Sequence, residues 1–355
     1  VCLLMMLLVI FLYFSLLPSL ILAQTSHRAQ IKGVLTNDSI HCSQIKHQLF
    51  QSTATTDAQR YEWERFLPVF VKTQLFDLQK NKRAGELEFP ETMEHGKFHL
   101  LGPVGPRCKT PIESYGKADD EKRVCGLQQL QKINQVKSQD GQKHECVVYS
   151  IGSNNQWGFE EAIIEKTECR IETFDCTLGD NFQLPSHLKD RVRFHAICLS
   201  DSDYEVNGRR FVSWETLNKL TGVLTQPTFL KMDIEGYEFP VLRSIVDSGV
   251  FLPLQIAVEV HFIRSVNGHN DWRRVSSVEL YSFINYIYKY GGYYLIDRHD
   301  NPLCESCTEI VLAKLKCENH PLPKNYQEIL LANEDIQHSG YLSAVKDSLK
   351  TKYYG

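Results

Sequence analysis

Short apolar segments alternate with amphipathic ones along the middle of this chain, and this alternation limits its fold more than any other feature. Five apolar runs have the length of buried strands: 146–151, 170–174, 192–197, 229–232 and 255–260. Segments with helical spacing lie between or after them, at 159–166, 213–220, 241–248 and 278–290. The pattern predicts an α/β fold, a parallel sheet with helices on both faces. Two further runs, at 293–296 and 310–313, are predicted to close the sheet as a hairpin pair.

The first 23 residues, Val1 to Ala23, contain no charged side chain. Their length suits a bilayer span, whereas Pro18 and the small Ala23 suit an export signal that is cleaved. A buried core helix is a third interpretation, but core helices are seldom apolar all round. We therefore expect a signal peptide or a signal-anchor, which places the rest of the chain in the secretory pathway, in the Golgi membrane or secreted.

Eleven cysteines fit an oxidising compartment. Cys2 lies in the apolar segment, and the remaining ten are an even number, which predicts disulfides. A zinc site at Cys304, Cys307 and Cys317 is the weaker interpretation, because no second ligand pair at zinc spacing accompanies them. Three cysteines in or beside predicted strands are expected to be buried thiols: Cys169, Cys176 and Cys198. The sequon at Asn37 indicates a glycosylation site.

The segments outside the alternating region differ in composition. Residues 24–56 are polar and aperiodic, as in a stem. Within 57–80, apolar residues recur at helical spacing, which predicts a helix that packs onto the next domain rather than one that binds a partner. We therefore expect four regions: the apolar segment (1–23), a stem and helical extension (24–107), an α/β domain (108–317) and a polar C-terminal tail (318–355).

The charge balance excludes one class of partner. The formal net charge is −4, and no run of basic residues is longer than two. A nucleic-acid partner needs a concentrated basic face, because neutralising phosphates supplies most of that affinity. We therefore expect no nucleic acid as a partner.

The ends of the predicted strands carry the residues that point to chemistry, because ligands of such sheets bind beyond the carboxyl ends of the strands. Ser150 lies near the end of the first strand, and Gly152 and Asn154 follow in a turn that lets a ligand approach the backbone. The full G-x-G-x-x-G pattern is absent. The second strand is followed by Asp175, 23 residues after Gly152, where a carboxylate can bind ribose hydroxyls. Capping of the next turn is the alternative role for this carboxylate.

The fourth and fifth strands end in a group of acids and a histidine. Asp233, Glu235 and Glu238 fall within six residues. The helix dipole explains acids at the start of the following helix, but it explains Asp233 less readily. Glu259 and His261 are two residues apart at the end of the fifth strand, so both point to the same side. This spacing favours an acid–base pair, with His261 as general base.

Four segments in order carry a resemblance to a known family: VVYSIGSNNQWGFEEA, IETFD, FLKMDIEGYEFPVL and QIAVEVHF. Together they resemble the FkbM-type S-adenosylmethionine-dependent methyltransferases. Within that group they look most like the animal methyltransferase-like branch, number twenty-four in its series. The similarity covers about Cys108 to Lys316 and is most specific in KMDIEGYE.

The resemblance implies a Rossmann-like, seven-stranded methyltransferase sheet with S-adenosylmethionine under the first two strand ends. By position, the methionine and ribose moieties would contact Ser150, Gly152, Asn154 and Asp175, and the adenine would lie near Ser200 and Asp201. The methyl acceptor would face Asp233, Glu235, Glu259 and His261. Family members are associated with O-methylation, including that of sugar hydroxyls.

We therefore expect a secretory-pathway O-methyltransferase whose acceptor is a hydroxyl group, most naturally on a glycan. The rival hypothesis is a catalytically silent methyltransferase fold that binds glycans or proteins in the lumen. In the enzyme, either His261 or a carboxylate removes the hydroxyl proton. A divalent cation held by Asp233 and a neighbouring carboxylate is the other way to acidify the hydroxyl, and the sequence leaves both options open.

Overall fold

The computed structural model describes residues 44–50, 101, 104–117, 120–134, 145–223, 226–261, 263–265, 272–274, 283–284, 286–299 and 307–316. The predicted signal segment, the sequon at Asn37, the helix at 57–80 and the tail at 318–355 lie outside the described residues. Within the described part of the chain, no helix has the length and apolarity needed for a membrane span.

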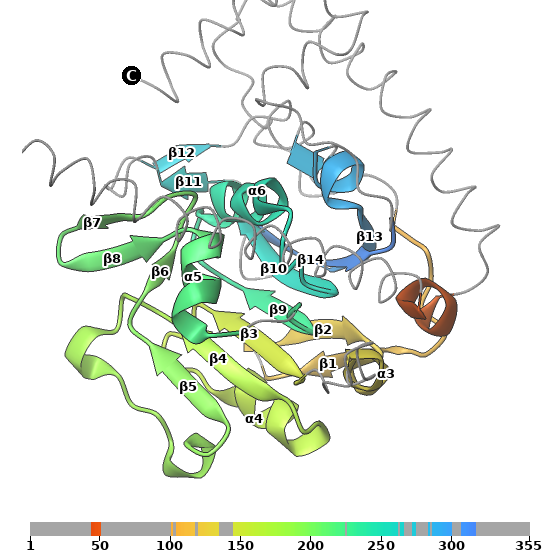
Figure 1. Ribbon diagram of the computed structural model, residues 1–355, viewed down its shortest axis with the longest axis horizontal. Coiled ribbons are helices and arrows are strands. Elements are labelled where there is room, and N and C mark those ends of the chain that lie inside the picture. The colour runs from red at the N-terminus through yellow and green to blue at the C-terminus, as the bar shows by residue number, and fades with distance from the viewer. Residues whose placement is uncertain are drawn as a thin grey trace, which may run out of the picture.

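A seven-stranded sheet forms the centre of the structure, in the order β13-β14-β10-β9-β3-β4-β5 (Figure 1). Within this sheet, the strands β3, β4, β5, β9 and β10 pair in parallel, and β14 runs antiparallel to both β10 and β13. Their bounds are β3 (Val147–Ile151), β4 (Arg170–Phe174), β5 (Val192–His195), β9 (Phe229–Met232), β10 (Gln255–His261), β13 (Tyr293–His299) and β14 (Cys307–Lys314). This confirms the predicted fold class, including the closing hairpin pair.

Helices cover both faces of this sheet. They are α3 (Leu127–Asn134), α4 (Gly158–Lys166), α5 (Trp214–Thr221), α6 (Glu238–Ser248) and a π-helix, η5 (Ile287–Gly291). Phe159 of α4 stacks on Phe229, whereas Trp214 of α5 packs edge-on against Tyr149. Phe229 pairs with Val148, the neighbour of Tyr149 in β3, so the two contacts lie on opposite faces of the sheet.

Several small elements were not predicted, because their strands are too short to give an apolar pattern. A hairpin of β1 (Ile112–Tyr115) and β2 (Lys122–Cys125) precedes the sheet. After β5, a three-stranded sheet forms from β6 (Cys198–Leu199), β7 (Tyr204–Val206) and β8 (Arg209–Val212). Further along are β11 (Ile263–Ser265) and β12 (Trp272–Arg274), and two 3-10 turns, η3 (Gly179–Asn181) and η4 (Ser186–Leu188), follow β4.

The structure contains disulfides, as the cysteine count predicted. The pairs are Cys108–Cys125, Cys146–Cys169 and Cys176–Cys198. The prediction of buried thiols at Cys169, Cys176 and Cys198 is therefore wrong. Its physical reason is register: parallel strands start side by side, so cysteines just before β3 and β4 come into contact. Cys307 is also disulfide-bonded, which argues against the zinc interpretation.

Removing the Cys146–Cys169 disulfide should destabilise the domain without changing its fold. The bond closes a loop with a sequence separation of 23, so the double change Cys146→Ala and Cys169→Ala should cost roughly 3 kcal/mol of unfolding free energy. Urea denaturation of the parent and the variant measures this difference. Dithiothreitol should lower the melting temperature of the parent by more than the double change does, because it reduces every disulfide. Equal midpoints for parent and variant would contradict the prediction.

Candidate cofactor and acceptor site

The turn after β3 lies against the end of β9. Gly152 has φ +81°, and a Cβ at this position would collide with the Asp233 carbonyl oxygen. Only glycine allows this approach without displacing β9. Lys231 of β9, which is buried, donates a hydrogen bond from Nζ to the Gly152 carbonyl oxygen. The turn predicted to hold the cofactor is therefore fixed to the strand that precedes Asp233 and Glu235, two of the predicted acceptor residues.

Asp175 follows β4 and organises the same turn. Its Oδ2 accepts hydrogen bonds from Ser153 N at 3.1 Å and Asn154 N at 2.8 Å. Its Oδ1 accepts from Thr177 N at 2.8 Å and Thr177 Oγ1 at 2.6 Å. These four bonds use the usual acceptor capacity of a carboxylate, so the turn-capping role is present in the structure. Binding of ribose hydroxyls by Asp175 stays a prediction.

A cavity of about 590 Å³ opens at the carboxyl ends of β3, β4 and β9. Its lining includes five of the predicted site residues: Gly152, Asn154, Asp175, Asp233 and Glu235. The other five are not part of the lining: Ser150, Ser200, Asp201, Glu259 and His261. The predicted cofactor and acceptor sides thus meet in one cavity.

The predicted residues outside the lining have identifiable places. Ser150 is completely buried within β3. Ser200 and Asp201 follow β6 rather than β5, and Ser200 N donates to the Val212 carbonyl oxygen at 2.9 Å, within the three-stranded sheet. Glu259 and His261 are both buried in β10 and are not part of the cavity lining.

Part of the cavity wall was not predicted. Phe174, Ile197 and Leu199 supply apolar surface, and the Cys176–Cys198 disulfide lies in the same wall. The β7–β8 hairpin adds a further group of lining residues: Val206, Asn207, Arg209 and Phe211. The residues of this hairpin come from short strands with no strong sequence pattern, so only their folded positions reveal them.

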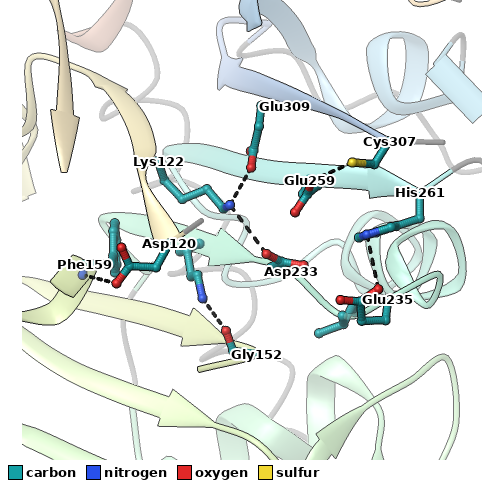
Figure 2. Close-up of polar contacts among 12 residues, drawn as sticks. Asp120, Lys122, Gly152, Phe159, Asp233, Glu235, Glu259, His261, Cys307 and Glu309 are labelled. Carbon is teal, nitrogen blue, oxygen red and sulfur yellow. Dashed lines mark hydrogen bonds and ion pairs between the residues drawn. The ribbon is translucent and has the colours of Figure 1, made fainter. Parts of the chain in front are cut away.

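Asp233 is the centre of a buried network of charges (Figure 2). Lys122 Nζ lies 3.5 Å from Asp233 Oδ2 and 2.5 Å from Glu309 Oε1. Burial alone would raise the pKa of Asp233, but the charges of Lys122 and Lys231 hold that pKa below its usual range. Burial and the nearby Asp233 charge raise the pKa of Glu259 to about 8. At neutral pH, Asp233 is therefore ionised and Glu259 holds a proton.

His261 is paired with two carboxylates. Its Nδ1 lies 3.0 Å from Glu238 Oε1 and its Nε2 lies 3.4 Å from Glu235 Oε2. Burial alone would lower the pKa of His261, but the hydrogen bond and charge of Glu238 raise it to about 9, with help from Asp233 and Glu235. The ring is therefore an imidazolium at neutral pH. Such a ring donates hydrogen bonds from both nitrogens and has no free lone pair to accept a proton, and the general-base role of His261 stays a prediction.

The loop between β9 and α6 holds these carboxylates in place. Glu238 is completely buried, and its Oε1 accepts hydrogen bonds from Ile234 N at 3.2 Å and Gly236 N at 3.1 Å. Glu235 has φ +53°, a left-handed conformation that is uncommon for a residue with a side chain. Glu238 therefore acts both at the start of α6, as the dipole argument proposed, and as the partner of His261.

Two groups of described residues have donor atoms close enough to hold a metal ion. The first is Glu259, His261 and Cys307, but a disulfide sulfur is a poor metal ligand. The second is Asp233, Glu235 and His261, whose donor atoms lie within 4.8 Å of one another. This second group is compatible with a divalent cation only after His261 Nε2 loses its proton. The cation stays a prediction.

Four buried residues near the site were missed as functional candidates: Asp120, Lys122, Glu238 and Glu309. Asp120 lines the cavity and accepts a hydrogen bond from Phe159 N, at the start of α4, at 2.9 Å. Glu238 was noted only as a helix-start acid. Lys122 lies in β2, a strand too short to give an apolar pattern, so no local sequence signal marked it.

One family model and several solved structures are similar to this chain. The family model of a methyltransferase domain (Methyltransf_22) matches residues 90–314. A search of curated proteins finds no significant match. Among solved structures, the methyltransferase FkbM from Methylobacillus flagellatus KT has 14% sequence identity and a TM-score of 0.31, and the match covers 47% of this chain and 43% of that one.

Two further solved structures have similar scores. TrmK from M. capricolum, in complex with S-adenosyl-homocysteine, has 11% identity and a TM-score of 0.27, covering 63% of this chain and 83% of that chain. An O-methyltransferase family 2 protein from Planctomyces limnophilus DSM 3776, in complex with apigenin, has 11% identity and a TM-score of 0.27, with coverage of 47% and 49%. The family match spans most of the chain, including every strand of the seven-stranded sheet. The chain belongs to this family of S-adenosylmethionine-dependent methyltransferase domains.

Proposed function

We propose that this protein transfers the methyl group of S-adenosylmethionine to a hydroxyl group, and that the acceptor is a glycan in the secretory pathway. One observation carries the proposal: a single cavity is lined both by the Gly152 turn and by Asp233 and Glu235. A cofactor bound at the turn would meet its acceptor beside the ionised Asp233 carboxylate. A silent binding module would need no such arrangement, so the enzyme is the better interpretation.

On the cofactor side, backbone and short side chains do the binding. Gly152, Ser153 and Asn154 line the cavity at the point where the β3 turn leaves room for a ligand. Asp175 holds this turn open through its two backbone hydrogen bonds. The apolar wall that includes Phe174 and Leu199 suits the flat face of adenine. Bound S-adenosylmethionine supplies a sulfonium methyl group that is open to attack.

On the acceptor side, Asp233 is the group that can accept a proton. As the acceptor oxygen forms its bond to the methyl carbon, the carbon–sulfur bond breaks and leaves the thioether S-adenosylhomocysteine. The hydroxyl proton passes to the Asp233 carboxylate, which is unprotonated and reaches the cavity. His261 does not reach the cavity and holds Glu235 and Glu238 in position. We therefore assign proton acceptance to Asp233 rather than to His261.

The secretory assignment is supported by the cysteines and the N-terminal segment. Three disulfides join described cysteines, and bonds of this kind persist in oxidising compartments. The uncharged residues 1–23 supply the export signal or a single-pass Golgi anchor, and the membrane is a partner only if that segment is retained. Glycan hydroxyls are abundant in that compartment, which makes glycans the acceptor class. Membership of the animal branch named above is part of the same proposal.

Cofactor binding tests the proposal most directly. Isothermal titration of the oxidised protein with S-adenosylmethionine should show binding. Asp175→Ala should weaken it by roughly tenfold or more, since losing the bonds that hold the turn costs about 1–3 kcal/mol. Asp190→Ala, an exposed acid in the turn before β5, is the matched control and should bind like the parent. No binding by folded parent protein would end the enzyme interpretation, and unchanged affinity in Asp175→Ala would refute its role.

Two carboxylate variants test the assignment of the proton acceptor. Asp233→Asn should lower kcat by about 10²-fold or more, within the usual range for losing acid–base help. Glu259→Gln should lower it far less, because Glu259 already holds a proton at neutral pH and Gln keeps a neutral donor there. Turnover per folded molecule is measured with radiolabelled S-adenosylmethionine and mixed glycan acceptors. Equal losses in the two variants would contradict the assignment.

A divalent cation is the second chemical option, because the side chains of Asp233, Glu235 and His261 come together. Addition of EDTA to the active enzyme separates the options. Unchanged turnover is expected if Asp233 accepts the proton directly. Loss of turnover that Mg²⁺ or Mn²⁺ restores would replace that mechanism with a metal-assisted one.

A further inference from the structure

Lys122 is a completely buried lysine that reaches the site from outside the seven-stranded sheet. It belongs to β2, whose last residue, Cys125, is fixed in two ways. The disulfide to Cys108 holds it covalently. The side-chain amide of Gln255, at the start of β10, accepts from Cys125 N at 3.1 Å and donates to the Cys125 carbonyl oxygen at 2.7 Å. These links fix how the hairpin docks on the sheet. In this placement, the Lys122 side chain points toward Glu309 and Asp233.

The Lys122 ammonium lies behind Asp233 as seen from the cavity. Its side chain is 0% exposed, whereas that of Asp233 is 19% exposed and lines the cavity. Figure 2 shows the lysine side chain reaching between the carboxylates of Glu309 and Asp233. Burial alone would lower the pKa of Lys122, but the charges of Glu309 and Asp233 raise it to about 12. The group facing Asp233 is therefore a permanent cation.

We propose that Lys122 is a positioning residue for methyl transfer, which holds the Asp233 carboxylate in the orientation that faces the acceptor. This inference rests on the proposed function. An aspartate side chain has two rotatable bonds, and an ion pair at 3.5 Å to a rigidly held ammonium restricts both. Lys122 does not reach the cavity, so it acts on the acceptor only through Asp233.

A purely structural role for Lys122 makes a different prediction. Glu309 lies closer to the ammonium than Asp233 does, at 2.5 Å, and removing the lysine alone would leave this buried carboxylate without its cation. If neutralising Glu309 were the whole task, removal of both charges would restore the protein. If Lys122 positions Asp233, removal of both charges would restore stability but not turnover.

The experiment compares three variants of the full oxidised chain with the parent. They are Lys122→Met, the double variant Lys122→Met with Glu309→Gln, and Lys219→Met as the control. Lys219 is an exposed lysine of α5 that pairs with Glu215 at 3.9 Å and is not part of the cavity lining. For each protein, we would measure the melting temperature, the Kd for S-adenosylhomocysteine, and kcat and KM for methyl transfer to a mixture of soluble glycosaminoglycan and N-glycan oligosaccharides.

The proposal expects a separation of these quantities. Lys122→Met should have a lower melting temperature and a kcat reduced tenfold or more. The double variant should recover most of the melting temperature but keep the low kcat, with the Kd for S-adenosylhomocysteine within twofold of the parent. Lys219→Met should match the parent throughout.

Three outcomes would overturn the inference. Recovery of kcat in the double variant would show that Lys122 only neutralises Glu309. A weakened Kd for S-adenosylhomocysteine in step with kcat would show that it supports the whole fold. A parent that binds S-adenosylhomocysteine but methylates none of the oligosaccharides would remove the proposed acceptor class, and the role of Lys122 with it. That last result differs from the first two because the parent itself is inactive.

Discussion

The contact between the Gly152 turn and the end of β9 joins the two halves of the site. β3 and β9 are neighbours in the sheet, so their carboxyl ends lie side by side. The absence of a side chain at Gly152 brings the turn against the Asp233 backbone, and Lys231 closes the contact with a hydrogen bond. A larger residue at Gly152 would separate the cofactor turn from Asp233, so this one approach determines whether the cavity holds both reactants together.

The sequence predicted the sheet well because buried parallel strands are continuous apolar runs, and those runs do not depend on distant contacts. The strand bounds at Phe229–Met232 agree with the structure, and the acids that follow them lie at the predicted strand end. The charge state of His261 could not be predicted. It depends on Glu238, 23 positions earlier in the chain, whose carboxylate pairs with the histidine ring only in the folded protein.

Lys122 and Glu309 were beyond sequence reasoning for a related reason. They lie 187 positions apart and meet only because the N-terminal hairpin docks against β10 and β14. The cysteine count predicted disulfides, yet not their pairing, and three cysteines were wrongly taken as thiols. In each case the missing information was which strand edges lie next to each other, a property of the fold and not of any local pattern.

The β7–β8 hairpin has a consequence for how acceptor preference can change. Its two-residue turn, Asn207-Gly208, has positive φ at both positions, as in the tight turns that match strand twist. The hairpin is inserted between β5 and β9 and contributes side chains to the cavity, but none of its strands pairs with the seven-stranded sheet. Sequence drift in this insertion can therefore alter which molecules fit the cavity while the cofactor turn and Asp233 keep their geometry. Related chains that differ in this insertion would then share one chemistry and diverge in what they modify.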